Sequence, residues 1–209
     1  MTADSASFRD ALEALAIERS GVRIRPVAVA ARAYTWDDIK DWPETAERTE
    51  IVHGDLIVSP TPSDPHAGAN NELGRVLSTY VKENNLGRMY IAPRDIVLAP
   101  DVVYEPDLCF VHRDRVNIIE LSNIAGPPDL VVEIISESNR SHDTVVKFAD
   151  YARYGVKEYW LVDLRESTVS TYELVASEYQ LLKHATGDDP LVTRVFRGLD
   201  LRAAAVFDF

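Results

Sequence analysis

The chain has 209 residues, of which 46% are hydrophobic and 27% are charged, and 34 acidic against 22 basic residues give a net charge of −12. This composition supports a globular domain with a buried core and excludes disordered, collagen-like and coiled-coil proteins. The single cysteine, Cys109, excludes a disulfide framework and a CxxC-type zinc site. The acidity argues against a broad surface for binding phosphate groups.

The first 33 residues look like an appendage. Phe8, Leu12 and Leu15 fall at helical spacing before Gly21. We therefore predict an N-terminal helical arm over residues 1–33, followed by one domain over residues 34–209. The N-terminus lacks the pattern of a signal peptide, and no apolar run reaches the ~20 residues that span a bilayer. A cytoplasmic protein without membrane association is expected.

Four elements are expected in the next 50 residues. Thr35 and Asp38 have the spacing of a capping box, which predicts a short helix over residues 35–42. Two strands, residues 49–52 and 55–59, flank the dipeptide His53-Gly54, which favours a tight hairpin turn. A proline-rich loop then leads to a helix over residues 66–84, whose apolar residues recur at helical spacing.

The second half is richer in strands. The pattern predicts strands at residues 88–92, 95–99, 106–111 and 128–136, a helix over 143–154 ended by Gly155, and strands at 157–164, 168–174 and 178–184 that form a meander. The tail is expected to hold one short strand and a final helix. Because the segment PDLVVEIIS is an almost unbroken apolar run, it predicts a central strand covered on both faces. The order indicates an α+β (mixed α/β) fold around one sheet.

Glu133 interrupts this apolar run. The alternation of side chains along a strand places it on the same face as Val131 and Ile135. Burying an isolated carboxylate costs roughly several kcal/mol unless it is paired or binds a metal. An ion pair with an Arg or Lys of a covering helix and a metal site are both open readings of Glu133.

Two Pro-Asp pairs could supply a second carboxylate. Asp129 lies four residues before Glu133, about 13 Å away along a strand, so we expect it at the start of the strand or in a loop. Asp107 begins a different strand, and if the two strands are neighbours the carboxylates of Asp107 and Glu133 could lie roughly 5 Å apart. Two acids at that distance repel, and Mg²⁺ is a natural way to neutralise them.

Lys147 belongs to the helix that follows. On a regular helix its apolar stripe consists of Val145, Phe148, Ala149 and Ala152. The opposite side carries Asp143, Lys147, Tyr151 and Tyr154. An Asp143–Lys147 pair on a solvated face explains this pattern, whereas the two tyrosines suggest a face that is partly covered.

Together these segments resemble the Uma-two family of restriction-endonuclease-like proteins. The resemblance rests on YTWDDI, TEIVHGDLIVSPTPSDPH, EPDLCFV and the long segment GPPDLVVEIISESNRSHDTVVKFADYARYGVKEYWLVDLRESTVSTYEL, and it covers residues from about 34 to 208. It implies a restriction-endonuclease-like core of the PD-(D/E)XK type, in which a mixed sheet is flanked by helices.

By this resemblance, Asp107 is the acid of the first motif and Glu133 the acid of the second. The superfamily's usual lysine position, two residues after the second acid, is here Ile135, which cannot serve. The Uma-two pattern has its lysine on the following helix, where Lys147 matches. Glu50 matches a family acid before the hairpin turn, and capping or packing explains it equally well.

His66 matches the histidine that opens the long helix, with the same alternative. The resemblance implies that Asp107 and Glu133 bind Mg²⁺ or Mn²⁺ and that Lys147 assists a water attacking a phosphodiester bond. It implies DNA as the substrate, and a homodimer by analogy, because two strands need two sites.

Two other readings compete. One is a non-catalytic descendant of the fold that acts as a binding or assembly module. The other is a hydrolase using Cys109, although a lone cysteine in an apolar strand is usually a core residue. No GxSxG, Gly-rich phosphate loop or HExxH motif is present.

His53, His142 and His184 fall in predicted turns or surface segments, apart from the other candidates. The nearest approach to a basic run is Arg19, Arg23, Arg25 and Arg32 in the arm, which could contact a phosphate backbone, tether the domain or contact a second copy.

Overall fold

The computed structural model describes residues 33–42, 48–59, 61–91, 93–136 and 140–209. The arm predicted over residues 1–33 lies, except for its last residue, outside the described residues. Within the described ranges, no helix combines the length and apolarity needed to cross a membrane.

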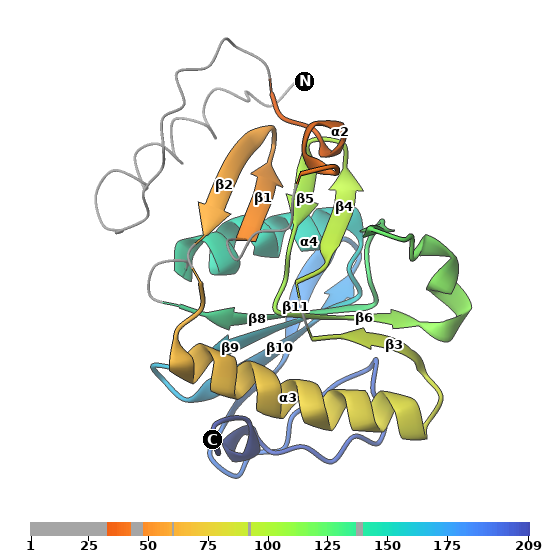
Figure 1. The fold of residues 1–209 in the computed structure, drawn as a ribbon. Helices are drawn as coiled ribbons and strands as arrows, with labels where there is room; N and C mark the ends of the chain where they lie inside the picture. Colours follow the sequence, from red (N-terminus) through yellow and green to blue (C-terminus); the bar gives the residue numbers. More distant parts are fainter. Residues whose placement is uncertain (1–32, 43–47, 60, 92, 137–139) are drawn as a thin grey trace.

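Two sheets form the framework (Figure 1). The helices are α2 Trp36–Ile39, α3 Asp64–Glu83 and α4 Phe148–Tyr154. The strands are β1 Arg48–Val52, β2 Asp55–Ser59, β3 Gly87–Tyr90, β4 Asp95–Ala99, β5 Val102–Tyr104, β6 Leu108–His112, β7 Asn123–Ala125, β8 Leu130–Ile135, β9 Glu158–Asp163, β10 Thr168–Val175 and β11 Glu178–Thr186. A six-stranded sheet has the order β11-β10-β9-β8-β6-β3, and a five-stranded sheet has the order β2-β1-β5-β4-β7.

The six-stranded sheet lies at the centre of the molecule. Figure 1 shows α3 along one face of this sheet, with α4 and the five-stranded sheet on the other. β8 pairs in parallel with β9 and antiparallel with β6, so the sheet is mixed. The α+β class is therefore confirmed, although the strands divide into two sheets where one was expected.

The first elements follow local sequence signals. The backbone N–H of Thr35 donates to the Asp38 carboxylate at 2.9 Å, as the capping-box spacing predicts. β1 and β2 form an antiparallel hairpin. At its turn His53 and Gly54 both have positive φ angles, 51° and 89°, which is the conformation that a tight hairpin turn requires. The predicted hairpin is thus confirmed.

Helix α3 begins two residues before the expected start and buries one face. Leu73, Leu77 and Val81 pack into a core cluster with Phe110 and Trp160 of the six-stranded sheet. Burying each such aliphatic side chain stabilises the fold by about 1.5–3 kcal/mol. This packing fixes α3 against the sheet and places its N-terminal end beside the loop that follows β2 (Figure 1).

Strand β8 is buried on both faces, as predicted. Val132 and Ile134 belong to the core cluster under α3. Val131 and Ile135 belong to a second cluster on the opposite face. The side of β8 that carries Glu133 therefore faces α4 and the five-stranded sheet.

The segment before α4 departs from the predicted helix. Residues His142–Lys147 form a π-helical turn, and only then does α4 run to Tyr154, ending at Gly155 with φ of 92°. The expected apolar stripe is wrong, because the side chain of Val145 is 58% exposed whereas Lys147 is only 3% exposed. The wider turn changes the phase of the helix, and the buried carboxylates described below draw the polar side inward.

Short elements also differ from expectation. β5 and β7, of three residues each, were not predicted, because three residues are too few to show an alternating pattern. In the tail, the expected strand is an isolated pairing of Pro190 with Arg202, and the expected helix is a short 3₁₀ turn, Ala203–Val206. The meander β9-β10-β11 is antiparallel, as predicted.

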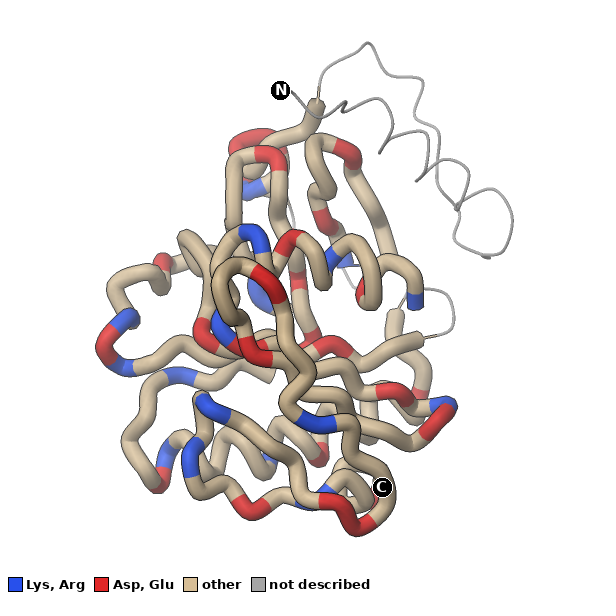
Figure 2. Tube along the Cα trace, turned by 180° about the vertical axis from the view of Figure 1, so that it is seen from behind, with Lys and Arg blue, Asp and Glu red and all other residues tan. Residues whose placement is uncertain are grey.

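The charges are mixed over the chain. Figure 2 shows Lys and Arg positions scattered along the trace and interspersed with Asp and Glu. In this view no face of the described residues carries basic residues alone. The acidic balance of the sequence is therefore distributed over the fold.

Candidate functional site

Asp107 and Glu133 meet on neighbouring strands. β6 and β8 pair antiparallel with Leu108 opposite Val132, so one further step places Asp107 opposite Glu133. The two residues are only 1% and 2% exposed. Both line a cavity of about 180 Å³. The sequence predicted adjacent carboxylates if the two strands are neighbours. The strands are neighbours, so this condition is met.

Asp129 lies at the other end of β8 and has a different role. Its carboxylate accepts the His112 backbone N–H at 2.7 Å and pairs with Arg115 at 3.1 Å and Lys157 at 2.7 Å. These contacts hold the start of β8 to the end of β6, to the turn that follows β6 and to the residue before β9. The expected place of Asp129 at the start of the strand is confirmed.

Lys147 lies among buried acids. Its ammonium nitrogen is 2.8 Å from Glu50 Oε1, 2.9 Å from Glu133 Oε1 and 3.7 Å from Asp143 Oδ1. Burial alone would lower the pKa of Lys147, but the charges of Glu133 and Glu50 outweigh burial and raise it. The neighbouring acids therefore favour the charged form of Lys147, and because the residue is only 3% exposed the reading as a solvated surface pair is wrong.

Glu50 reaches the same lysine from β1. One carboxylate oxygen accepts the backbone N–H of Glu105 at 3.1 Å, and the other lies 3.1 Å from His142 Nε2. Burial would raise the pKa of Glu50, but the Lys147 charge and the contact with His142 hold it well below its usual range. Glu50 therefore stays ionised and helps to anchor Lys147.

The two strand carboxylates differ in their surroundings. Burial would raise the pKa of Asp107, yet His66, at 3.2 Å from Oδ2, and Arg48, bound to the other oxygen, lower it. Oδ2 of Asp107 also accepts the Ile134 backbone N–H at 2.7 Å. Burial raises the pKa of Glu133, with the Asp107 charge adding to the effect and Lys147 opposing it. The two carboxylates therefore repel each other, and a bound cation would reduce this repulsion.

The sequence alone missed several residues of this site. Tyr151 donates its hydroxyl to Glu133 at 3.0 Å, and burial raises the pKa of Asp143 well above its usual value. The sequence analysis placed Asp143 and Tyr151 on the helix face that carries Lys147, but it did not assign either residue to the site. Arg48 lies two residues before Glu50, on the same face of β1, which was a usable signal. Nothing in the sequence indicated that His142 would contact Glu50.

Cys109 does not behave as a nucleophile. It is buried in the second core cluster, and burial raises the pKa of its thiol to about 12. Its neighbour in sequence, His112, accepts the backbone N–H of Asp114 at 3.3 Å with Nδ1. Cys109 is a small residue of the core.

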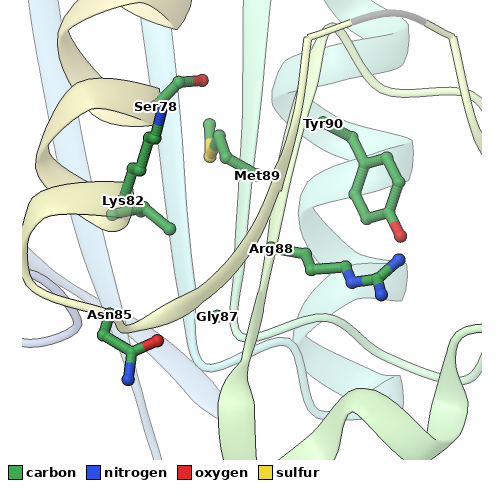
Figure 3. Close-up of a pocket in the computed structure, with 8 residues that line it drawn as sticks. Ser78, Lys82, Asn85, Gly87, Arg88, Met89 and Tyr90 are labelled. Carbon is green, nitrogen blue, oxygen red and sulfur yellow. The ribbon is translucent and has the colours of Figure 1, made fainter.

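A larger cavity, of about 370 Å³, lies between the C-terminal end of α3 and the edge strand β3. In Figure 3, Met89 points toward α3 while Arg88 and Tyr90 point to the other side of the strand. The residues that line it include Lys82 and Arg88 but no carboxylate. The larger cavity is therefore not the one that holds the candidate residues, because the carboxylates line the smaller one.

The donor set of the smaller cavity fits a hard divalent cation. Among the described residues, no three or more His, Cys, Asp and Glu side chains are grouped so that they could hold a metal ion by themselves. Mg²⁺ does not need one, because it is usually held by one or two carboxylates together with water and substrate phosphate. Asp107 and Glu133 would hold the ion, with Arg48 and Lys147 as their present counter-charges.

Comparison with known proteins identifies the family. Residues 36–204 match the sequence model of Uma2, described as "Putative restriction endonuclease". The chain belongs to the Uma2 family. This confirms the resemblance found in the sequence. The Uma2 chain is also similar in fold to a crystal structure of "a putative nuclease belonging to DUF820" from Anabaena variabilis, with a TM-score of 0.67, 23% identity, and coverage of 83% of this chain and 97% of that one. No curated protein matches it.

Proposed function

We propose that this protein is a metal-dependent endonuclease that hydrolyses phosphodiester bonds of DNA. The observation that carries the proposal is the convergence of the buried side chains of Asp107, Glu133 and Lys147 on one cavity. Membership of the Uma2 family supports the reaction class.

The carboxylates of Asp107 and Glu133 would hold one or two Mg²⁺ or Mn²⁺ ions. When bound, such an ion supplies a water of lowered pKa and neutralises charge that develops on the phosphate. Tyr151 fixes the orientation of Glu133 through its hydroxyl, and the Ile134 backbone N–H does the same for Asp107.

Lys147 would act on the nucleophile and on the developing charge. Its ammonium group is within hydrogen-bond distance of Glu133, so it can donate to a water held beside that carboxylate. Glu50 keeps the lysine charged and fixes its position from the other side. Lys147 would thus take the role of the lysine that the superfamily usually has two residues after the second acid, where this chain has Ile135.

A second candidate is a non-catalytic binding module. It is favoured by the ion pairs that already neutralise both strand carboxylates, Arg48 with Asp107 and Lys147 with Glu133. Such pairs can be retained to specify a fold without any chemistry.

Cleavage of supercoiled plasmid in Mg²⁺ or Mn²⁺ separates the two candidates. The wild-type chain should nick the plasmid, and Glu133→Gln should reduce the rate by at least about 100-fold, because charge stabilisation at the phosphate is lost. Glu178→Gln, at an exposed position of β11, is the matched control and should cleave normally. Cleavage that persists in an Asp107→Asn/Glu133→Gln double variant would remove the site assignment.

A further inference from the structure

Two side chains with nitrogen donors flank Asp107 from different elements. Arg48 of β1 binds one carboxylate oxygen, and His66 of α3 lies 3.2 Å from the other. Both residues line the same cavity as Glu133. His66 is only 6% exposed, so the surrounding fold fixes its ring beside the strand carboxylates.

Each of these side chains has a second nitrogen with no hydrogen-bond partner. Nε of Arg48 and Nδ1 of His66 are both buried and unpaired in the structure. A buried polar atom without a partner is costly, so native proteins keep few of them without a functional reason. The pair thus retains hydrogen-bonding capacity beyond its contacts with Asp107.

The start of α3 adds a third feature to this wall. Thr61, Pro62 and Ser63 line the cavity, and Ser63 is the N-cap of the helix. The Ser63 side chain makes no capping hydrogen bond. The first N–H groups of a helix lack intrahelical partners and carry partial positive charge, which favours an anion there. Pro65 has no N–H, so the donors of this turn are the N–H groups of Asp64 and His66, and the Asp64 carboxylate partly offsets their charge.

We propose that Arg48, His66 and the first turn of α3 form a subsite for a phosphodiester group of the nucleic acid, beside the Asp107–Glu133 pair. The inference rests on the proposed function, because it requires a metal cation at Asp107. That cation would compete with Arg48 and His66 for the two carboxylate oxygens. Arg48 and His66 would then donate their hydrogen bonds to phosphate oxygens instead. Arg48 suits this exchange, because a guanidinium presents several donors in one plane.

Charge makes the two ligands depend on each other. The cavity is lined by four acids, Glu50, Asp107, Glu133 and Asp143, against Arg48, Lys147 and His66. A phosphate alone meets this acidic lining and is repelled, whereas a divalent cation removes most of the repulsion. The phosphodiester and the cation should therefore bind with positive coupling, each tightening the other.

Calorimetric titration tests the subsite without requiring turnover. The probes are thymidylyl-thymidine, which carries one phosphodiester, and inorganic phosphate, each with and without Ca²⁺, a cation that also prefers oxygen ligands. We expect the dinucleotide to bind in Ca²⁺ and more weakly without it. Arg48→Met and His66→Phe should each weaken binding by about 10- to 100-fold, the usual loss of a hydrogen bond to a charged group.

Two further variants control for folding and for charge. Arg48→Lys keeps a positive charge beside Asp107 but removes the extra donors, and it should still weaken binding about tenfold. Arg115→Met removes an arginine that pairs with buried Asp129 at the far end of β8, and its binding should equal that of wild type. Thermal unfolding of each variant shows whether it is folded.

The outcomes separate this inference from the proposed function. Dinucleotide binding that is the same in wild type, Arg48→Met and His66→Phe overturns the subsite, even if plasmid is cleaved. Binding of inorganic phosphate in preference to the dinucleotide overturns the assignment to a phosphodiester. Dinucleotide binding that depends on Arg48 in a chain that cleaves no plasmid supports the subsite and removes the nuclease.

Discussion

Around the ammonium of Lys147, oxygens of Glu50 and Glu133 lie at 2.8 and 2.9 Å, and the ring of Tyr104 lies 5.6 Å away. Removing the ammonium leaves two carboxylates buried beside each other without compensation. Lys147→Met should therefore lower the free energy of unfolding by about 3–5 kcal/mol, measured by urea denaturation. Lys157→Met is the control, because Lys157 is 59% exposed although it also pairs with a buried acid, Asp129. Its loss should stay below about 1 kcal/mol, and equal losses in both variants would contradict the burial argument.

Asp95 and Glu105 form a second pair of acids close to Glu50. Burial raises the pKa of Asp95 to about 6, and burial with the Asp95 charge raises the pKa of Glu105 to about 7. A carboxyl group whose pKa is higher in the folded state binds its proton more tightly there. The stability it contributes is present at low pH and is lost as pH rises through about 7.

Glu105→Gln should remove most of this penalty. We expect the variant to be more stable than wild type by about 1–2 kcal/mol at pH 8, after allowance for its partial exposure, and no more stable at pH 4. Urea denaturation at the two pH values measures the difference. A variant less stable than wild type at pH 8 would show that Glu105 is needed there as an anion.

Of the individual site residues, the sequence predicted those whose position follows from the alternation of side chains along a strand. Glu133 stands out as an acid inside an apolar run, and its opposite neighbour Asp107 follows once the two strands are paired. Strand alternation could have placed Arg48 on the face of Glu50, but not its pairing with Asp107, which joins segments far apart in the chain. The contact of His142 with Glu50 could not be assigned for the same reason. The burial of Lys147 was likewise hidden, since a regular helix turns that side away from its apolar stripe.

Gly87 joins α3 to the edge strand β3. Its φ of 149° is outside the range that other residues favour, and an added Cβ would lie 2.1 Å from the carbonyl oxygen of Val111. Gly126 also has a positive φ, 118°, but no atom lies within 4 Å of the added Cβ. The two glycines therefore separate the cost of backbone conformation from the cost of a clash.

Gly87→Ala should lower the free energy of unfolding by at least about 2 kcal/mol, because strain and a clash with backbone add. Gly126→Ala should cost about 1 kcal/mol, from backbone strain alone. Thermal or urea denaturation of both variants gives the comparison. Equal losses would mean that β3 moves away from β6 without cost.

The elements predicted well are those whose signal is local or periodic. The hairpin turn at His53-Gly54, the buried strand β8 and the meander β9-β10-β11 each have such a signal. The π-helical turn before α4 has no local signal in the sequence. It places Lys147 beside buried acids of β1 and β8, which are distant in the chain. The division into two sheets depends on which strands pair, which a single sequence does not show.

For the whole molecule, the net charge of −12 limits how DNA can be bound. Among the described residues, the Lys and Arg side chains that line the cavity are Arg48 and Lys147. Neutralising two phosphates gives a slope of about −2 for the logarithm of the binding constant against the logarithm of salt concentration. Fluorescence anisotropy of a labelled duplex in Ca²⁺ measures it. A slope near about −6 would instead assign binding to further basic residues, such as the four arginines of residues 19–32.

Diffraction from crystals soaked in Mn²⁺, measured near the manganese absorption edge, tests the central claim most directly. The proposal predicts an anomalous peak bonded to the carboxylates of both Asp107 and Glu133, at about 2.0–2.3 Å, and its loss in Glu133→Gln crystals. Soaked crystals in which Arg48 and Lys147 keep their pairs with the two acids, and no peak lies between them, would contradict it and leave the cavity as a structural ion-pair network.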